Sequence, residues 1–167
     1  LIIFVTSKTF YEVKSLYKNN NICFSFSSEN GASFNIIDKK SLNKYSFKRI
    51  INKNAITVSE IKKRLYSLSL KYQKYFSFIS DLEITEQIKI TKLEEKQLHD
   101  FYKREFSVSL LWYGSKTTYL KFKEKLEQLK LQATFGGKII NVSGLHNKLD
   151  AVKFFNQYTS KLYKTSN

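Results

Sequence analysis

Residues 106–112 alternate between apolar and polar side chains, as a strand with one buried face does. The apolar members of this segment are Phe106, Val108, Leu110 and Trp112. The period then changes to a helical one, with an apolar stripe formed by Tyr119, Phe122, Leu126 and Leu129. The pattern therefore predicts a strand, a turn at Gly114 and a helix that begins near Lys116 and is edged with lysine.

A second strand and helix are predicted near the C-terminal end. Residues 138–144, "KIINVSG", are expected to form the strand, and residues 146–162 the last helix, with Asn147 as its N-cap. Gly136 and Gly137 in "TFGGK" are expected to end the preceding helix and reverse the chain. The side chains of the last helix that are expected to face the core are Leu149, Val152, Phe155 and Leu162.

Two helices and a strand are predicted between residues 57 and 103. Thr57 and Glu60 have the spacing of a capping box, and apolar residues at helical intervals then predict a helix over 59–75. Residues 78–90 are interpreted as a strand with Ile79 and Ile84 near its core. A second possible capping box, "TKLE" at 91–94, predicts an inserted helix near 92–103.

The first 56 residues predict a small N-terminal α+β extension. Its expected elements are a short helix over 8–20, a strand over 21–28, a turn over 28–33 and a returning strand over 34–38. From residue 57 the order is helix, strand, inserted helix, strand, helix, strand, helix. Such a chain makes a small mixed sheet with helices on one face, so the predicted fold class is α+β, with domains at 1–56 and 57–167.

The charge narrows the choice of partners. The 167 residues include 29 basic and 14 acidic ones, for a net charge of +15. A fold this basic repels itself unless something anionic neutralises it, and nucleic acid is the first expectation, against the alternative of a basic protein with no such partner. The longest apolar runs, such as "LIIFV", are far shorter than a membrane span, so no membrane-spanning segment is expected.

The composition also indicates the source of the gene. The chain is rich in Lys, Asn, Ile, Phe and Tyr, has no Pro, and has Arg only at positions 49, 64 and 104. These residues together indicate a gene rich in A and T, as organelle genomes often are. Lysine then replaces arginine by default, so the choice of lysine carries little chemical information.

No catalytic arrangement is recognisable. The sequence has no phosphate-loop motif, no dinucleotide-binding fingerprint and no zinc-protease helix. Cys23 is a single cysteine, which excludes an internal disulfide, and His99 and His146 are far apart without a third ligand at metal spacing. The sequence therefore predicts a protein that is not an enzyme and has no cofactor and no metal site.

The lysines after Gly114 have two interpretations. Lys116, Lys123 and Lys130 are seven residues apart and form one stripe, whereas Lys121 lies elsewhere on the exterior. They are either the solvated side of an ordinary helix or a contact for phosphate groups. The second interpretation gains from the helix N-terminus, whose free N–H groups and positive dipole end favour an anion, and from Gly114, which would let the backbone approach it.

The C-terminal half resembles the type II KH domain of small-subunit ribosomal protein three. "KIINV", "KLDA" and "SKL" in 138–162 are similar to the last strand and helix of that family, "ISDLEITE" to its first KH strand, and "SVSLLWY" to its second. The resemblance covers about residues 57–164 in the right order. It aligns "GSKT", residues 114–117, with the nucleotide-clamping G-x-x-G loop, with Thr117 in place of the last glycine.

This resemblance implies a structural component of a mitochondrial small ribosomal subunit, located in the mitochondrion, that binds rRNA in the subunit head. The implied RNA-binding residues are Gly114, Ser115, Lys116, Thr117, Lys121, Lys123 and Lys130. Its implied partners are the small-subunit rRNA, neighbouring ribosomal proteins and a separate chain supplying the family's second domain, unless the lineage lost that domain. The alternatives are a free RNA-binding translation factor and an accessory subunit of an organellar respiratory complex.

Overall fold

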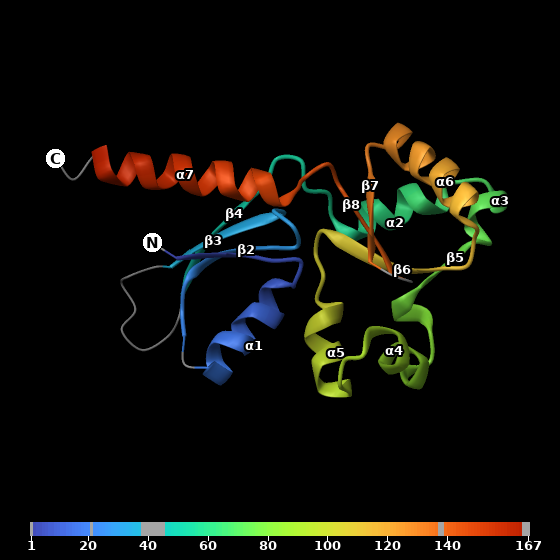
Figure 1. Ribbon diagram of the computed structural model, residues 1–167, viewed down its shortest axis with the longest axis horizontal. Coiled ribbons are helices and arrows are strands. Elements are labelled where there is room, and N and C mark those ends of the chain that lie inside the picture. The colour runs from blue at the N-terminus through green and yellow to red at the C-terminus, as the bar shows by residue number, and fades with distance from the viewer. Residues whose placement is uncertain (1, 21, 38–45, 137–138, 165–167) are drawn as a thin grey trace. The chain divides into compact units, whose positions relative to one another are not determined.

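The computed structural model describes residues 2–20, 22–37, 46–136 and 139–164, with side chains up to Lys161 (Figure 1). The chain divides into two compact units. Unit 1 consists of Leu1–Ala55 and His146–Asn167, and unit 2 of Ile56–Leu145. The sequence prediction has a boundary at residue 56 but assigns all of 57–167 to one domain, whereas here the last helix belongs with the N-terminal segment.

Unit 1 is a four-stranded sheet with one helix on each face. Its elements are β1 (Ile3–Val5), α1 (Phe10–Asn20), β2 (Ser25–Ser28), β3 (Ser33–Ile37), β4 (Phe47–Ile51) and α7 (Lys148–Lys164). The strand order is β1-β2-β3-β4. Strands β1 and β2 are parallel, while β2–β3 and β3–β4 are antiparallel. Helix α1 is thus the crossover between two parallel strands, as such strands require.

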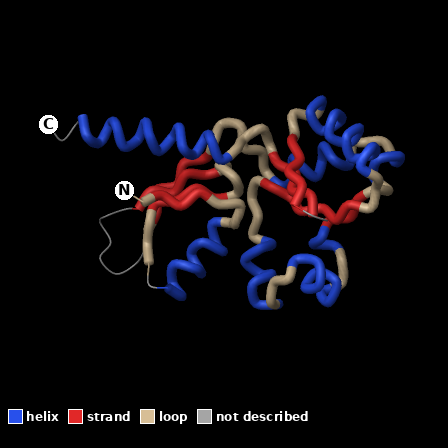
Figure 2. The backbone as a smooth tube through the Cα atoms, in the orientation of Figure 1, coloured by secondary structure: helices blue, strands red, loops and turns tan. Residues whose placement is uncertain are grey.

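The two helices cover opposite faces because side chains alternate along each strand. Phe26 of β2 packs with Val13 and Tyr17 of α1. Phe34 of β3 points to the other face and packs with Phe155 of α7. Figures 1 and 2 show α1 and α7 on either side of this sheet.

Unit 2 is an antiparallel sheet with order β5-β6-β8-β7. Its strands are β5 (Phe76–Phe78), β6 (Ser107–Trp112), β7 (Gln132–Gly136) and β8 (Ile139–Ser143). Its helices are α2 (Val58–Tyr66), α3 (Leu70–Gln73), the 3-10 turn η1 (Ile79–Asp81), α4 (Ile84–Thr91), α5 (Glu95–Tyr102) and α6 (Lys116–Gln128).

The core of unit 2 lies between the sheet and helices α2 and α6. Val108 and Leu110, on one face of β6, pack with Phe122 and Leu126 of α6 and with Ile61 of α2, all of them buried. These are the residues whose spacing predicted a strand and a helix, and both predictions are confirmed.

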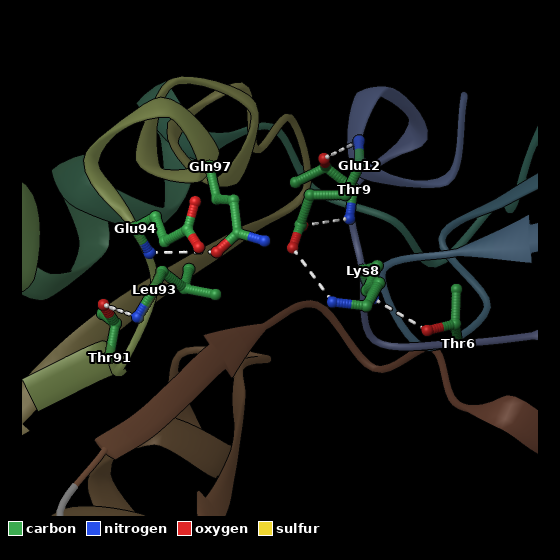
Figure 3. Close-up of polar contacts among 8 residues, drawn as sticks. All are labelled: Thr6, Lys8, Thr9, Glu12, Thr91, Leu93, Glu94 and Gln97. Carbon is green, nitrogen blue, oxygen red and sulfur yellow. Dashed lines mark hydrogen bonds and ion pairs between the residues drawn. The ribbon is translucent and has the colours of Figure 1, made fainter. Parts of the chain in front are cut away.

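Capping interactions fix the start of several helices. Figure 3 shows two of them: the Thr9 hydroxyl accepts a bond from the Glu12 N–H and the Glu12 carboxylate accepts one from the Thr9 N–H, at the start of α1. The Glu94 N–H likewise donates to the Gln97 side chain in a capping box that begins α5. The inserted helix was therefore predicted correctly, but its cap is Glu94 and not Thr91.

Several other local predictions are confirmed. Strand β8 forms as expected, and so does helix α7 with Asn147 as its N-cap. The structure also has the expected helix (α1), strand (β2), turn and returning strand (β3) in the first 37 residues. The coarse class, α+β, is also confirmed.

Three predictions about individual elements are wrong. Residues 84–91 form helix α4 instead of a strand, and the helix predicted over 59–75 is broken after Tyr66. Helix α6 ends at Gln128, because Lys130 takes the left-handed backbone conformation (φ 54°) that stops a helix, so Gly136 lies in strand β7. Gly137 and the Leu162 side chain lie outside the described residues.

The predicted inward face of α7 is also partly wrong. Phe155 is buried, but Leu149 and Val152 are 56% and 46% exposed. The helix was expected to cover the sheet that contains residues 106–112, whereas it packs on the sheet of unit 1 and turns a different side towards it.

Candidate functional site: the carboxyl edge of β1 and β2

The parallel strands β1 and β2 end at the same edge of the unit 1 sheet, with Val5 opposite Ser27. In open sheets that contain parallel strands, ligands bind in the crevice outside the carboxyl ends of those strands. Three segments lie at this edge: the loop Thr6–Thr9 before α1, the turn Glu29–Gly31 after β2, and the start of α7 at Asn147.

The loop Thr6–Thr9 connects β1 to α1 and is held by short-range bonds. The Thr6 N–H donates to the Ser27 carbonyl at 3.1 Å, which extends the hydrogen bonding between β1 and β2 by one residue. The Thr6 hydroxyl is buried and accepts a bond from the Lys8 N–H at 3.1 Å (Figure 3). Because its oxygen is the acceptor in that bond, the hydroxyl proton can still be donated to a ligand.

The turn Glu29–Gly31 has an unusual backbone. Three successive residues have positive φ: Glu29 at 45°, Asn30 at 58° and Gly31 at 98°. Non-glycine residues rarely adopt this conformation, which concentrates at functional sites. The Glu29 N–H donates to the Lys8 carbonyl and the Asn30 N–H to the Thr6 carbonyl, each at 2.9 Å. The turn is therefore bonded directly to the loop Thr6–Thr9.

The start of α7 lies against the same turn. The Asn147 side chain accepts bonds from the Leu149 and Asp150 N–H groups, and the Asp150 carboxylate accepts one from the Asn147 N–H at 3.0 Å. A β-carbon on Gly31 would overlap the Asn147 carbonyl, so only glycine fits there. The starts of both α1 and α7 are thus brought to one place.

Asn52 and His146 support this arrangement. The Asn52 amide donates to the Gly31 carbonyl at 3.0 Å and to the Asp150 carboxylate at 3.2 Å. The fully buried His146 ring donates from Nε2 to the Glu29 carbonyl at 3.0 Å. Burial lowers the pKa of His146, and its bond to the Glu29 carbonyl opposes that shift only in part, so the ring is neutral at neutral pH.

The charges at this edge are unevenly compensated. Lys8 forms an ion pair with Glu12 at 3.5 Å. Lys148, by contrast, is exposed, is the first residue of α7, and forms no ion pair with the residues that the structure describes. A cation at the positive end of a helix is unfavourable by about 0.3–1 kcal/mol. The Asp150 carboxylate in the first turn of α7 offsets part of this cost, and an anion bound beside Lys148 would offset it further.

The described residues offer no metal centre. Within that part of the chain no group of three or more His, Cys, Asp or Glu residues could hold a metal ion, so we assign no metal ligand. No helix in the same residues has the length and apolar character that crossing a membrane requires.

The residues predicted to bind RNA lie on unit 2, around the start and outer side of α6. Ser115 is the N-cap and its side chain accepts a bond from the Thr118 N–H. The side chains of Lys116, Thr117, Lys121, Lys123 and Lys130 are exposed. Lys130 lies beyond the end of α6, so it does not continue the stripe of Lys116 and Lys123.

Gly114 has a different reason to be glycine from the one inferred. A β-carbon there would lie 2.7 Å from the Trp112 ring, so the missing side chain makes room for that ring. Nothing in the structure ties this residue to a phosphate.

The fold as a whole is similar to that of haloacid dehalogenase-like hydrolases. No protein-family model matches the sequence, and no curated protein matches it either. Among solved structures, a haloacid dehalogenase-like hydrolase from Bacteroides thetaiotaomicron has a TM-score of 0.58 at 12% identity, over 95% of this chain and 65% of its own. One from B. subtilis has a TM-score of 0.56 at 11% identity, over 95% of this chain and 66% of its own.

A third neighbour comes from a study of phosphatases of the haloalkanoate (HAD) enzyme superfamily. This Bacteroides thetaiotaomicron protein has a TM-score of 0.56 at 15% identity, over 95% of this chain and 59% of its own. The chain therefore spans less than two thirds of the length of these neighbours. At such identities the likeness establishes the fold, and it extends over both units.

These neighbours correct the interpretation of the chain as a ribosomal protein. The solved structures with a similar fold are haloacid dehalogenase-like hydrolases, not small-subunit ribosomal protein three or another KH domain. The assignment to that ribosomal family is therefore wrong, and so are the expected roles in the ribosome, in translation and in a respiratory complex. The expected rRNA and ribosomal protein partners were inferred from that family, so these predictions are wrong too. The prediction of a non-enzyme is contradicted too, because the solved structures with a similar fold are hydrolases.

The structure shows why the short motifs misled. "KIINV" lies largely in β8 of unit 2, whereas "KLDA" begins α7 of unit 1, so the two do not form one strand–helix pair of a KH domain. "ISDLEITE" is a 3-10 turn and the start of α4, not a strand. The sheet of unit 2 is antiparallel throughout, whereas a mixed sheet was expected.

Sequence reasoning missed the site at the carboxyl edge of β1 and β2. One signal was available: "TSKT" follows an apolar run and precedes a helical pattern whose cap is Thr9, as in a strand–loop–helix junction. Thr6 and Lys148 are 142 positions apart, and no local pattern connects them.

Proposed function

We propose that this chain supplies the phosphate-binding groups of a phosphate-ester hydrolase with the haloacid dehalogenase-like fold. The observation that carries the proposal is Lys148, a cation without an ion pair among the described residues, at the start of α7. Bonds through Asn30 and the Gly31–Asn147 contact hold that helix start next to the loop before α1.

Three groups at this edge suit a phosphoryl oxygen. The start of α1 presents backbone N–H groups and a positive dipole end, which favour an anion. The Thr6 hydroxyl can donate its proton, and Lys148 supplies a positive charge that phosphate would neutralise. The net charge of +15 raises the local concentration of anionic substrates around the whole chain.

The carboxylates at this edge act in the framework. Glu12 caps α1, Asp150 caps α7 and bonds to Asn52, and Glu29 is 1% exposed. We therefore assign binding roles to Thr6 and Lys148 and give none of these three carboxylates the role of nucleophile.

Phosphate binding is tested by titrating the isotope-labelled chain with inorganic phosphate and following backbone amide resonances. The amides of residues 7–10 and 148–150 should shift together. Lys148→Met should weaken this binding by about tenfold, as the loss of a charge-assisted contact does. Lys116→Met, which removes an exposed lysine at the start of α6, is the matched control and should bind as the wild type does.

The hydrolase part of the proposal is tested separately with the protein from its natural source. Activity on p-nitrophenyl phosphate should copurify with it, and inorganic phosphate should inhibit that activity competitively. Amide shifts that are absent from both segments, or equal losses in Lys148→Met and Lys116→Met, would contradict the binding site. A natural protein without phosphatase activity would contradict the assigned reaction.

A further inference from the structure

Unit 2 contains a cavity that the phosphate-binding edge does not involve. Its volume is about 130 Å³, and it lies among α2, the end of α5, and strands β5 and β6. The apolar part of its wall is formed by the side chains of Val58, Phe78, Phe101 and Val108. An enclosed apolar cavity of about 150 Å³ holds benzene. This space is slightly smaller but opens to solvent, so a single aromatic ring or a branched alkyl group can be partly enclosed in it.

Two cations lie on the wall of this cavity, each against an aromatic ring. The Lys62 ammonium lies 4.8 Å from the centre of the Phe78 ring, and the Arg104 guanidinium 4.5 Å from the centre of the Phe101 ring. These cation–π contacts keep both charged groups at the cavity wall. Arg104 also donates from Nη1 to the Ser107 hydroxyl at 3.0 Å, which fixes the plane of its guanidinium.

None of the described residues that line the cavity is acidic. Lys62 is half-buried and has no carboxylate partner in the described part of the chain. A partly desolvated cation beside an apolar wall is favourable only when an anion or water compensates it. Small-molecule sites combine such apolar walls with a few polar groups in this way.

We propose that this cavity binds a small organic carboxylate whose body is an aromatic ring or a branched alkyl group. The body occupies the space among Phe78, Phe101 and Val108, and the carboxylate faces Lys62 and Arg104. The site lies within unit 2 alone, so the proposal is independent of the phosphate-binding function.

The test uses benzoate as the probe, titrated into the isotope-labelled chain. The amides of Lys62, Phe78, Phe101 and Ser107–Ser109 should shift, and those of residues 7–10 should not. Acetate lacks the ring and benzyl alcohol lacks the charge, so each should bind at least about tenfold more weakly than benzoate. Inorganic phosphate should not displace benzoate, because it has no apolar body.

Lys62→Gln removes the charge and should weaken benzoate binding by about fivefold or more. Lys63→Gln, on the exposed side of the same helix, is the control and should leave binding unchanged. The comparison of benzoate with benzyl alcohol needs no variant, so it decides the question even if Lys62→Gln does not fold. Benzoate that shifts no amide of the cavity, or that binds no better than benzyl alcohol, overturns the proposal.

Discussion

Gly31 and the Asn147 carbonyl are packed so closely that any β-carbon at position 31 would overlap the carbonyl oxygen. Gly31 also has φ 98°, which residues with a side chain rarely adopt. Because both constraints act on backbone atoms, Gly31→Ala should lower the free energy of unfolding by about 2–4 kcal/mol, measured by urea denaturation.

Gly136→Ala is the matched control for this change. A β-carbon at position 136 would have the Ile139 carbonyl oxygen at 3.8 Å as its neighbour, an ordinary contact. Its effect should be within about 1 kcal/mol of zero. Equal losses of stability in the two variants would show that the Gly31–Asn147 contact is not the cause.

The buried His146 predicts that stability depends on pH in the acid range. Its pKa is lowered in the folded chain, so the unfolded chain binds a proton first as the pH falls below about 6.5. The free energy of unfolding should therefore be unaffected by this group above that pH and should fall below it, until the pH reaches the folded pKa.

His146→Gln should flatten this pH dependence between about pH 5 and about pH 7, measured by urea denaturation at a series of pH values. Glutamine keeps an N–H donor for the Glu29 carbonyl but does not titrate. His99, whose side chain is 75% exposed, gives the control variant His99→Gln. A slope that persists unchanged in His146→Gln would assign it to other groups.

We expect Lys148 to favour phosphate binding but to lower the stability of the ligand-free chain. Replacing this cation at the start of α7 with methionine should raise the free energy of unfolding of the ligand-free chain by about 0.3–1 kcal/mol. Inorganic phosphate should stabilise the wild type and have a smaller effect on Lys148→Met. Thermal denaturation with and without phosphate measures both effects, and destabilisation of the ligand-free variant would contradict the electrostatic argument.

The N-cap Ser115 allows the contribution of one helix cap to the stability of unit 2 to be measured. Its hydroxyl accepts a bond from the Thr118 N–H at 3.1 Å, so Ser115→Ala should cost about 1 kcal/mol of stability. Thr117→Ala, an exposed change in the first turn of the same helix, should cost nothing or stabilise slightly. Guanidinium denaturation followed by Trp112 fluorescence compares them, and losses of equal size would count against the cap.

Local patterns identified most elements because they depend on neighbouring residues. The alternation from Phe106 to Trp112 and the helical spacing from Tyr119 to Leu126 appear directly in β6 and α6. The prediction of a strand over residues 84–91 failed, because isoleucines at 84, 88 and 90 suit a strand or a helix equally well.

The candidate site was beyond such reasoning for a different reason. Thr6, Asn30 and Lys148 come together only because α7 packs on the sheet of unit 1, and the sequence gives no sign that the last helix returns there. A short resemblance at "KLDA" then assigned this helix to the wrong unit. Long-range pairing decides the site, whereas local spacing decides the elements.

The division of the chain also bears on the order in which it folds. Unit 2 is one continuous stretch, Ile56–Leu145, whereas unit 1 needs two segments that unit 2 separates, and the Asn52–Asp150 bond joins them. Bringing the two segments of unit 1 together costs entropy, and this cost grows with the length of flexible chain between them. Once unit 2 has folded, the flexible chain between the two segments is shorter and the cost is smaller. Unit 2 should therefore acquire hydrogen-exchange protection first during refolding, with the strands of unit 1 protected later.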